Sequence, residues 1–262
     1  MPRQRLGQHF LHDPGWRQRI LATLRLAPNQ TWLEIGPGHG EMTQLLAAPD
    51  RRIIAIEADP RLAEDLRATR DAQPHQWPNL EIISADVLAT NIGELITGTF
   101  HVYGNLPYYI TSPILHQLFR SAAQIASIQI VIQLEVAERI TAQPGVRDYG
   151  YLSALCQFYA QPKIALRIPP GAFRPPPQVK SALVGMTLPG AQAHLRIADE
   201  NRFLEFVQTC FGQKRKTLRN NLLSLAADAQ IHAALAAAQL RPDARAEQLT
   251  LAQFAALYAQ LV

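Results

Sequence analysis

Between residues 14 and 135, short runs rich in Ile and Val alternate with stretches of helical periodicity. The apolar runs lie at residues 31–35, 52–56, 80–84, 100–103 and 128–133. One helical stretch precedes them, at 16–26, and three lie between them, at 41–48, 60–70 and 112–120. Strands that alternate with helices are typical of βαβ units, in which parallel strands form one sheet covered by helices. We therefore predict an α/β fold.

After residue 135 the pattern changes. Helical patterns at 136–142 and 151–159 are followed by two further strand patterns, at 160–168 and 179–188. The segment 169–177 between these strands contains five prolines and lacks too many backbone donors for a helix or a central strand. Beyond Pro189-Gly190 only helical patterns remain, at 200–210, 214–227, 231–239 and 251–261. We predict two domains, residues 1–189 and residues 190–262.

Composition narrows the class of protein. The chain of 262 residues has a formal net charge of +4, a mild excess that permits a nucleic-acid partner without requiring one. Cys156 and Cys210 are far apart, which excludes a disulfide framework and a cysteine zinc site, and the histidines form no metal-binding pattern. No secretory signal or membrane-spanning run is present. We expect a cytoplasmic monomer that binds neither a metal nor a membrane.

A glycine-rich turn follows the first apolar run, with Gly36, Gly38 and Gly40 separated by single residues. Glycine permits positive φ angles and lets a ligand approach the backbone. Glu41 stands where the dinucleotide fingerprint has its third glycine, and an acidic side chain at a helix N-terminus repels a pyrophosphate. The turn alone is equally typical of a plain strand-to-helix connection. If it binds a ligand, we expect a nucleoside without phosphates at this position.

The next two strands are followed by carboxylates. Glu57 comes 21 residues after Gly36, and Asp86 follows the run at 80–84. The first can accept hydrogen bonds from two ribose hydroxyls, and the second from the exocyclic amine of adenine. A single acid in such a place is usually a helix cap, which is our interpretation of Asp59 before Pro60. Glycine, Glu and Asp at three consecutive strand ends favour a bound adenosine.

The segment Asn105-Leu106-Pro107-Tyr108 follows the fourth run and indicates the chemistry. The adenine N6 amine is a poor nucleophile because its lone pair is delocalised into the ring. The Asn105 side-chain oxygen and a carbonyl of the Leu106-Pro107 turn can accept its two hydrogens and so orient the nitrogen. Tyr108 offers a ring on which a flipped base can stack. In isolation the segment is more typical of a simple turn, but its place after Gly36, Glu57 and Asp86 favours methylation of an amine.

Together these motifs resemble the rRNA adenine N6,N6-dimethyltransferases of the KsgA/RsmA type, which act on small-subunit (16S) rRNA. The resemblance covers nearly the whole chain. The matching segments lie, in order, at residues 7–11, 34–40, 56–59, 85–88, 105–109, 133–137, 149–153, 173–177 and 211–218.

The resemblance implies a Rossmann-like class I methyltransferase sheet of seven mostly parallel strands, with an antiparallel last strand and a small C-terminal all-helical domain. It implies S-adenosylmethionine as the methyl donor and two adjacent adenosines in the 3′-terminal hairpin of 16S rRNA as the substrate, each dimethylated. It also implies the following site residues. His9, Leu11, Gly36, Gly38, Glu57, Asp86 and Asn105 would contact the cofactor, while Asn105, Leu106, Pro107, Tyr108 and Phe173 would form the catalytic site, with Phe173 covering the second face of the base.

A cluster of cations in the C-terminal region is the candidate RNA contact. Lys214, Arg215, Lys216 and Arg219 fall within six residues, and Arg147 is a further candidate. Such runs are usually solvated helix surface. Near a flipped-base site, contact with RNA phosphates is the better interpretation, and it would position the RNA without reading its sequence.

Three other functions fit the sequence less well. A methyltransferase acting on large-subunit rRNA shares most of the motifs, although Leu106 and the basic run favour the small subunit. A binding module without catalysis is disfavoured by the intact Asn105, Pro107 and Tyr108. A dehydrogenase is disfavoured most, because the third fingerprint glycine is absent.

Overall fold

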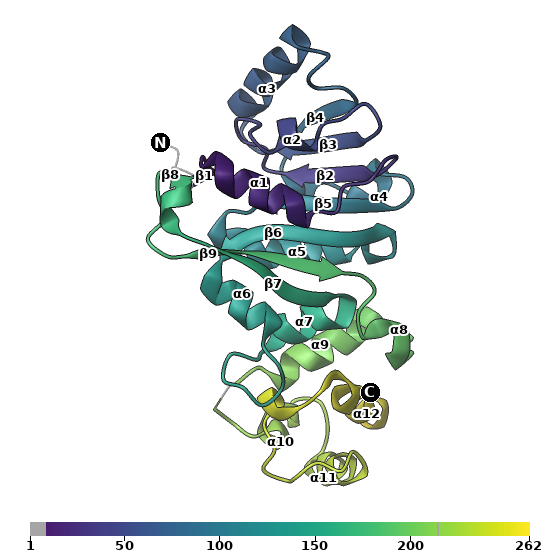
Figure 1. Cartoon of the computed structure of the whole chain (residues 1–262). Helices are drawn as coiled ribbons and strands as arrows, with labels where there is room; N and C mark the ends of the chain where they lie inside the picture. The colour runs from purple at the N-terminus through teal and green to yellow at the C-terminus, as the bar shows by residue number, and fades with distance from the viewer. Residues whose placement is uncertain (1–8, 214) are drawn as a thin grey trace, which may run out of the picture. The chain divides into compact units, whose positions relative to one another are not determined.

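A computed structural model of the chain describes residues 9–213 and 215–262 and divides into two compact units (Figure 1). The first unit contains the chain up to Ala137 together with Lys163–Leu188, and the second contains Glu138–Pro162 and Pro189–Val262. Our predicted division at residues 189/190 placed 138–162 in the first domain. The structure groups this segment with the C-terminal helices because α7 (Tyr151–Tyr159) packs on α9 (Glu200–Cys210), with the Phe158 and Phe203 rings 5.2 Å apart.

The first unit is built on a seven-stranded sheet with the order β4-β3-β2-β5-β6-β9-β7. Its first five strands along the chain are parallel neighbours, and β9 pairs antiparallel with β6. The strands are β2 (Thr31–Ile35), β3 (Arg52–Glu57), β4 (Leu80–Ser84), β5 (Phe100–Asn105), β6 (Ile125–Gln133), β7 (Gln161–Ile168) and β9 (Ser181–Thr187). This topology confirms the predicted mostly parallel, seven-stranded class I methyltransferase sheet with an antiparallel last strand.

Helices follow the strands as the alternation predicts. They are α1 (Pro14–Thr23), α2 (Thr43–Leu46), α3 (Pro60–Ala72), α4 (Ile92–Leu95), α5 (Thr111–Phe119) and α6 (Leu134–Thr141). Ile20 of α1, Leu46 of α2 and Leu66 of α3 belong to one buried cluster with Trp32 and Tyr103 of the sheet. Residues next to Trp32 and Tyr103 along the strands, such as Leu33, point to the opposite face of the sheet and are also buried. Burial of both faces explains why the strands read as continuous apolar runs rather than as alternating ones.

A two-stranded ribbon escaped the sequence analysis. β1 (Phe10–Leu11) pairs antiparallel with β8 (Phe173–Arg174), which lies within the proline-rich segment predicted to be a loop. Leu11 is the partner of Phe173, and the backbone N–H groups of His12 and Asp13 both donate to the Ala172 carbonyl. The ribbon therefore ties the N-terminal segment to the first unit, although each strand is too short to carry a periodic signal.

The second unit is helical. Besides α7 and α9 it contains α8 (Gln192–Leu195), α10 (Leu218–Leu222), α11 (Asp228–Ala237) and α12 (Leu251–Leu261). The helix predicted over 214–227 is wrong in extent. Thr217 caps α10, its hydroxyl accepting from the Asn220 N–H, so Arg215 and Lys216 precede the helix in a turn, and Lys214 lies outside the described residues. Among the helices that the structure describes, none is long and apolar enough to cross a membrane.

The glycine turn generates a stability prediction. Gly40 has a φ of +83°, and a Cβ atom there would lie 2.6 Å from Leu66 Cδ1 and 2.8 Å from Trp77 Cη2. We expect Gly40→Ala to lower the free energy of unfolding by about 1–3 kcal/mol, measured by urea denaturation, because strain and overpacking add. Gly171→Ala is the matched control, since a Cβ at Gly171 meets nothing within 4 Å. Equal stability of the two variants would contradict the tight packing of this turn.

Candidate functional site

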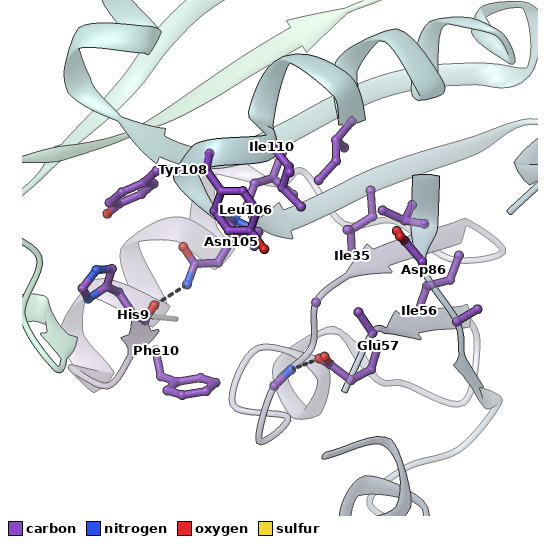
Figure 2. A pocket seen from close by; sticks show the side chains of 18 residues that line it. His9, Phe10, Ile35, Ile56, Glu57, Asp86, Asn105, Leu106, Tyr108 and Ile110 are labelled. Carbon is purple, nitrogen blue, oxygen red and sulfur yellow. Dashed lines mark hydrogen bonds between the residues drawn. The ribbon is translucent and has the colours of Figure 1, made fainter. Parts of the chain in front are cut away.

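A pocket opens at the carboxyl ends of β2, β3, β4 and β5 (Figure 2). The parallel register places these ends in one row, because Ile35 of β2 is level with Ile56 of β3 and Gly104 of β5, and Glu57 is level with Ser84 of β4. The pocket has a cavity volume of about 100 Å³, and about 810 Å³ when the open space at its mouth is included. Nine predicted site residues line it: His9, Gly36, Gly38, Glu57, Asp86, Asn105, Leu106, Pro107 and Tyr108.

The glycine turn forms the floor of this pocket. Gly36 and Gly38 have φ angles of +67° and +59°, which L side chains rarely adopt. A Cβ at Gly36 would meet no atom closer than the Asn105 carbonyl oxygen at 4.0 Å, so it would occupy open space. A Cβ at Gly38 would lie 2.9 Å from the Phe10 ring. The backbone at Gly36 is thus open to a ligand, while the neighbouring turn is packed.

Glu57 is a buried carboxylate, 3% exposed, that is held by the backbone. Its Oε2 accepts from the Gly38 N–H at 3.0 Å, and its Oε1 accepts from the Asp59 N–H at 2.9 Å. Each carboxylate oxygen has a second lone pair to offer. The side chain is therefore fixed in orientation and can still accept hydrogen bonds from two adjacent hydroxyls of a ligand.

Asp86 caps a short helix with one carboxylate oxygen and leaves the other free for a ligand. One oxygen, Oδ1, accepts from the Leu88 N–H at 2.9 Å and caps a short 3-10 helix (η1, Val87–Ala89). The residue is exposed and lines the pocket, so its other oxygen is available to a donor. Asp59 caps α3, with Oδ1 accepting from the Arg61 N–H, which confirms the helix-cap interpretation for that residue.

Asn105 has a defined amide orientation. Its Nδ2 donates to the His9 carbonyl at 2.8 Å (Figure 2), and because a carbonyl only accepts, the NH₂ group must face it. The Oδ1 atom is therefore the free end of the side chain. Leu106 is anchored by its N–H to the Val131 carbonyl at 3.0 Å, and no described group donates to its own carbonyl oxygen. The Pro107 carbonyl already accepts from the Ile110 N–H, so the Leu106 carbonyl is the second acceptor of this turn that has no described donor.

Tyr108 begins a 3-10 helix (η2, Tyr108–Ile110) at the edge of the pocket. Its hydroxyl is 2.7 Å from the Ser181 hydroxyl, which fixes the ring. Burial raises the pKa of this phenol, against a smaller lowering by the Ser181 hydrogen bond, so the group stays neutral at physiological pH. The His9 ring stacks on Tyr108 with centroids 5.7 Å apart, and its Nδ1 is 2.7 Å from the Pro175 carbonyl.

Two predicted site residues do not line the pocket. Phe173, expected to cover a target base, is 1% exposed and packs in the core cluster with Leu11 and Ile168. Its pairing in the β1–β8 ribbon directs the ring inward, so in this structure that expectation is not met. Leu11, expected to contact the cofactor, is 5% exposed and borders a smaller cavity next to the pocket.

Other lining residues were not predicted. Most are apolar residues close in sequence to the predicted site residues, and two of them, Phe10 and Tyr109, are aromatic. The full set is Phe10, Ile35, Ile56, Ala58, Ala85, Val87, Tyr109, Ile110 and Ile114. Their proximity to Glu57, Asp86 and Asn105 along the chain was an available signal. The charged side chains of the described lining are carboxylates, with no Lys or Arg among them, so the pocket suits a neutral or cationic ligand rather than a phosphate.

The predicted RNA-contact residues belong to the second unit. Arg215 and Lys216 are exposed in the turn before α10, and Arg147 is exposed in the connection after α6. Arg219 differs from expectation, because its guanidinium forms a two-pronged ion pair with Asp228, at 2.6 and 2.8 Å. That pairing neutralises the charge that a phosphate would need.

Comparison with known proteins gives close relatives over the full length. The family model described as "Ribosomal RNA adenine dimethylase" matches residues 2–261. The protein named Ribosomal RNA small subunit methyltransferase A of Koribacter versatilis is 39% identical and covers 98% of this chain and 93% of its own length. Its namesake in Xanthomonas campestris is 42% identical over 95% of this chain and 92% of its own length.

Solved structures agree on the fold. A dimethyladenosine transferase from Plasmodium falciparum superposes with a TM-score of 0.77 and 22% identity over 96% of this chain and 97% of its own. The 23S rRNA methyltransferase ErmE superposes with a TM-score of 0.68 and 28% identity over 96% of this chain and 99% of its own. Both the family model and the relatives extend across both units, and we conclude that this chain belongs to the ribosomal RNA adenine dimethylase family.

Proposed function

We propose that this chain transfers methyl groups from S-adenosylmethionine to N6 of two adjacent adenosines near the 3′ end of 16S rRNA during assembly of the small subunit. The observation that carries the proposal is the geometry of the Asn105-Leu106 turn. The Asn105 Oδ1 and the Leu106 carbonyl oxygen both lack a described donor, and both residues line the pocket. Two acceptors are what an amine with two hydrogens requires.

The residues of the pocket fit S-adenosylmethionine. The cofactor has an adenosine part with one exocyclic amine and two ribose hydroxyls, and a cationic amino-acid part without phosphate. Asp86 would accept from the amine, Glu57 from the hydroxyls, and the open backbone at Gly36 would lie against the ligand. The absence of Lys and Arg from the described lining suits a cation. When bound, the cofactor supplies an electrophilic methyl group on a sulfonium.

The protein's own contribution is mainly positioning. Acceptance of both N6 hydrogens by Asn105 and Leu106 would orient the nitrogen and favour a pyramidal geometry, in which the lone pair is less delocalised into the ring and the nitrogen is more nucleophilic. Transfer would move the positive charge from sulfur to nitrogen, and the methylated N6 would then lose one proton to solvent. Neither a strong base nor a metal is needed in this scheme. Tyr108 stacks on the base once the His9 ring, which now lies against it, gives way.

The choice of the small subunit rests on the sequence relatives. The relatives at 39% and 42% identity carry names that refer to the small subunit, whereas ErmE, whose title refers to 23S rRNA, is 28% identical. The fold alone favours neither substrate. We assign RNA positioning to the exposed cations of the second unit, Arg215, Lys216 and Arg147, with Lys214 as a further candidate outside the described residues.

Removal of the Asn105 amide tests the proposed function. We expect Asn105→Ala to lower methyl transfer to undermethylated small subunits by about 10²–10³-fold, because an acceptor that acts in the transition state is lost. Cofactor affinity should change little. Asn91→Ala is the matched control, since Asn91 is exposed and makes no cap hydrogen bond. Normal turnover of Asn105→Ala would refute the assigned role, and preferential labelling of large subunits by the wild type would refute the choice of substrate.

The Glu57 carboxylate generates a binding prediction. We expect Glu57→Ala to weaken S-adenosylmethionine binding by about 10–100-fold in calorimetry, because two hydrogen bonds to a buried charged group are lost. Glu64→Ala removes an exposed carboxylate from α3 and should leave the affinity unchanged. Wild-type affinity in Glu57→Ala would exclude the ribose contact.

The basic turn before α10 generates a prediction for RNA binding. With Arg215→Gln and Lys216→Gln combined, the slope of log affinity against log salt should become shallower by about 1–2, because fewer counterions are released from the phosphates. A second double variant, Arg25→Gln with Arg61→Gln, removes the same charge from exposed positions in the first unit and should keep the wild-type slope. An unchanged slope in the first variant would place the RNA elsewhere.

A further inference from the structure

The inward packing of Phe173 leaves one face of the target base without a partner. Enzymes that act on a flipped base hold it between aromatic or apolar side chains on both of its faces. Tyr108 is available for one face, but Phe173 is 1% exposed and packs in the core cluster, paired with Leu11 in the β1–β8 ribbon. If the base is enclosed on both faces, the second side chain must come from another part of the chain.

The His9 ring lies in the position that this second side chain requires. It stacks on Tyr108, with the ring centroids 5.7 Å apart and the ring planes at 26° to each other. Figure 2 shows the two rings facing each other, with the Asn105 amide beside them. The same amide donates to the His9 backbone carbonyl at 2.8 Å. The group expected to hold the N6 amine is therefore adjacent to both rings.

Each of the two rings is held at its edge rather than at its face. The Tyr108 hydroxyl is 2.7 Å from the hydroxyl of Ser181, which is fully buried at the start of β9. The His9 Nδ1 atom is 2.7 Å from the Pro175 carbonyl, and because a carbonyl only accepts, Nδ1 carries a proton and donates it. Hydrogen bonds at the ring edges fix the orientation of the rings and leave their faces free to stack.

The present spacing of the rings is slightly too small for a base. A base stacked on both rings needs ring planes about 7 Å apart, twice the rise per base of a nucleic-acid strand, so the rings must separate by at least about 1 Å. Rotation about the side-chain torsions of His9 provides a movement of this size without a change in the backbone. The hydrogen bond from Asn105 to the His9 carbonyl can then persist while the ring moves.

From these contacts, and resting on the proposed function, we propose that the His9 ring forms the second wall of the slot for the target adenine, opposite Tyr108. Without RNA the two rings stack on each other. When a flipped adenine enters, the His9 ring moves outward and stacks on the free face of the base, while N6 faces the Asn105 Oδ1 and the Leu106 carbonyl. The side chain of His9 is thus assigned to the substrate, and no covalent bond is made or broken in this step.

Two substitutions of His9 separate its ring from its hydrogen bond. His9→Phe keeps a flat ring and loses the donor to Pro175, whereas His9→Asn loses the ring and places an NH₂ donor at about the position of Nδ1. Their kcat and KM would be measured with undermethylated small subunits and saturating S-adenosylmethionine. We expect kcat to be about 10-fold lower in His9→Asn than in His9→Phe, because stacking on one face of the base is lost.

The value of KM for the subunits should differ by less than about twofold between the two variants, since phosphate contacts outside the slot supply most of the RNA affinity. His12→Asn is the matched control. It changes an exposed histidine in the same segment and should keep the wild-type kcat.

Three results would overturn the proposal, and each has a different meaning. A higher kcat in His9→Asn than in the wild type would show that the ring only blocks the slot. Equal kcat in His9→Asn and His9→Phe would show that another side chain covers the base. A lower kcat in His9→Phe than in His9→Asn would show that the hydrogen bond to Pro175, and not the ring, is what matters.

Cofactor affinity separates this function from a cofactor contact of the same side chain. By calorimetry, both variants should bind S-adenosylmethionine within about twofold of each other. Weaker binding by His9→Asn, by about the factor seen in kcat, would assign the ring to the cofactor and overturn the proposal. Thermal unfolding checks that each variant is folded, and His9→Leu is the second ringless variant if His9→Asn is not.

Failure of the proposed function has a different signature. If the wild type transfers no methyl groups to small subunits, the proposed function itself is wrong. Transfer by the wild type together with any of the contradicting results for His9 would exclude only the second wall.

Discussion

The site depends on the parallel register of β4, β3, β2 and β5. Because Ile35, Ile56 and Gly104 are level, the residues that follow them reach the same edge of the sheet. Four positions separated by up to 69 residues in the chain, from Gly36 to Asn105, then form one row. Neither local propensity nor a single motif could bring them together, and a slip of one residue in any pair would turn the flagged side chains to the other face. The buried apolar faces of the sheet fix this register.

The hydrogen bond between Asn105 and the His9 carbonyl connects that row to the N-terminal segment. It orients the amide so that an oxygen, and not an NH₂ group, is the free end. The β1–β8 ribbon holds the segment in place, with Leu11 paired to Phe173. His9 thereby determines which end of the Asn105 amide is free.

Much of the fold was predictable because both faces of the sheet are covered, which makes the strands short, apolar and easy to recognise. The runs at 31–35 and 80–84 match β2 and β4 in full. Gly36, Glu57, Asp86 and Asn105 were predictable because each lies at or just after a strand end, where the topology determines proximity. His9 was predicted only from the family resemblance. The true extent of the helix predicted over 214–227 was not predictable, because the Thr217 cap starts α10 within a run of good helix formers.

Tertiary contacts explain the remaining differences. The ion pair of Arg219 with Asp228 joins α10 and α11, and Phe173 packs against residues far away in the sequence. Local sequence patterns therefore predict neither contact. The same holds for the His9 ring, because only the structure shows that it lies against Tyr108.

The central claim concerns which nucleotides are modified, and nucleotide-resolution mapping tests it most directly. Small subunits that lack these methyl groups would be incubated with the purified protein and isotope-labelled S-adenosylmethionine, and the RNA would be digested and analysed by mass spectrometry. The account predicts label on two adjacent adenosines near the 3′ end of 16S rRNA, with two methyl groups on each N6. Label confined to other nucleotides, to large-subunit RNA or to ribosomal protein would contradict it.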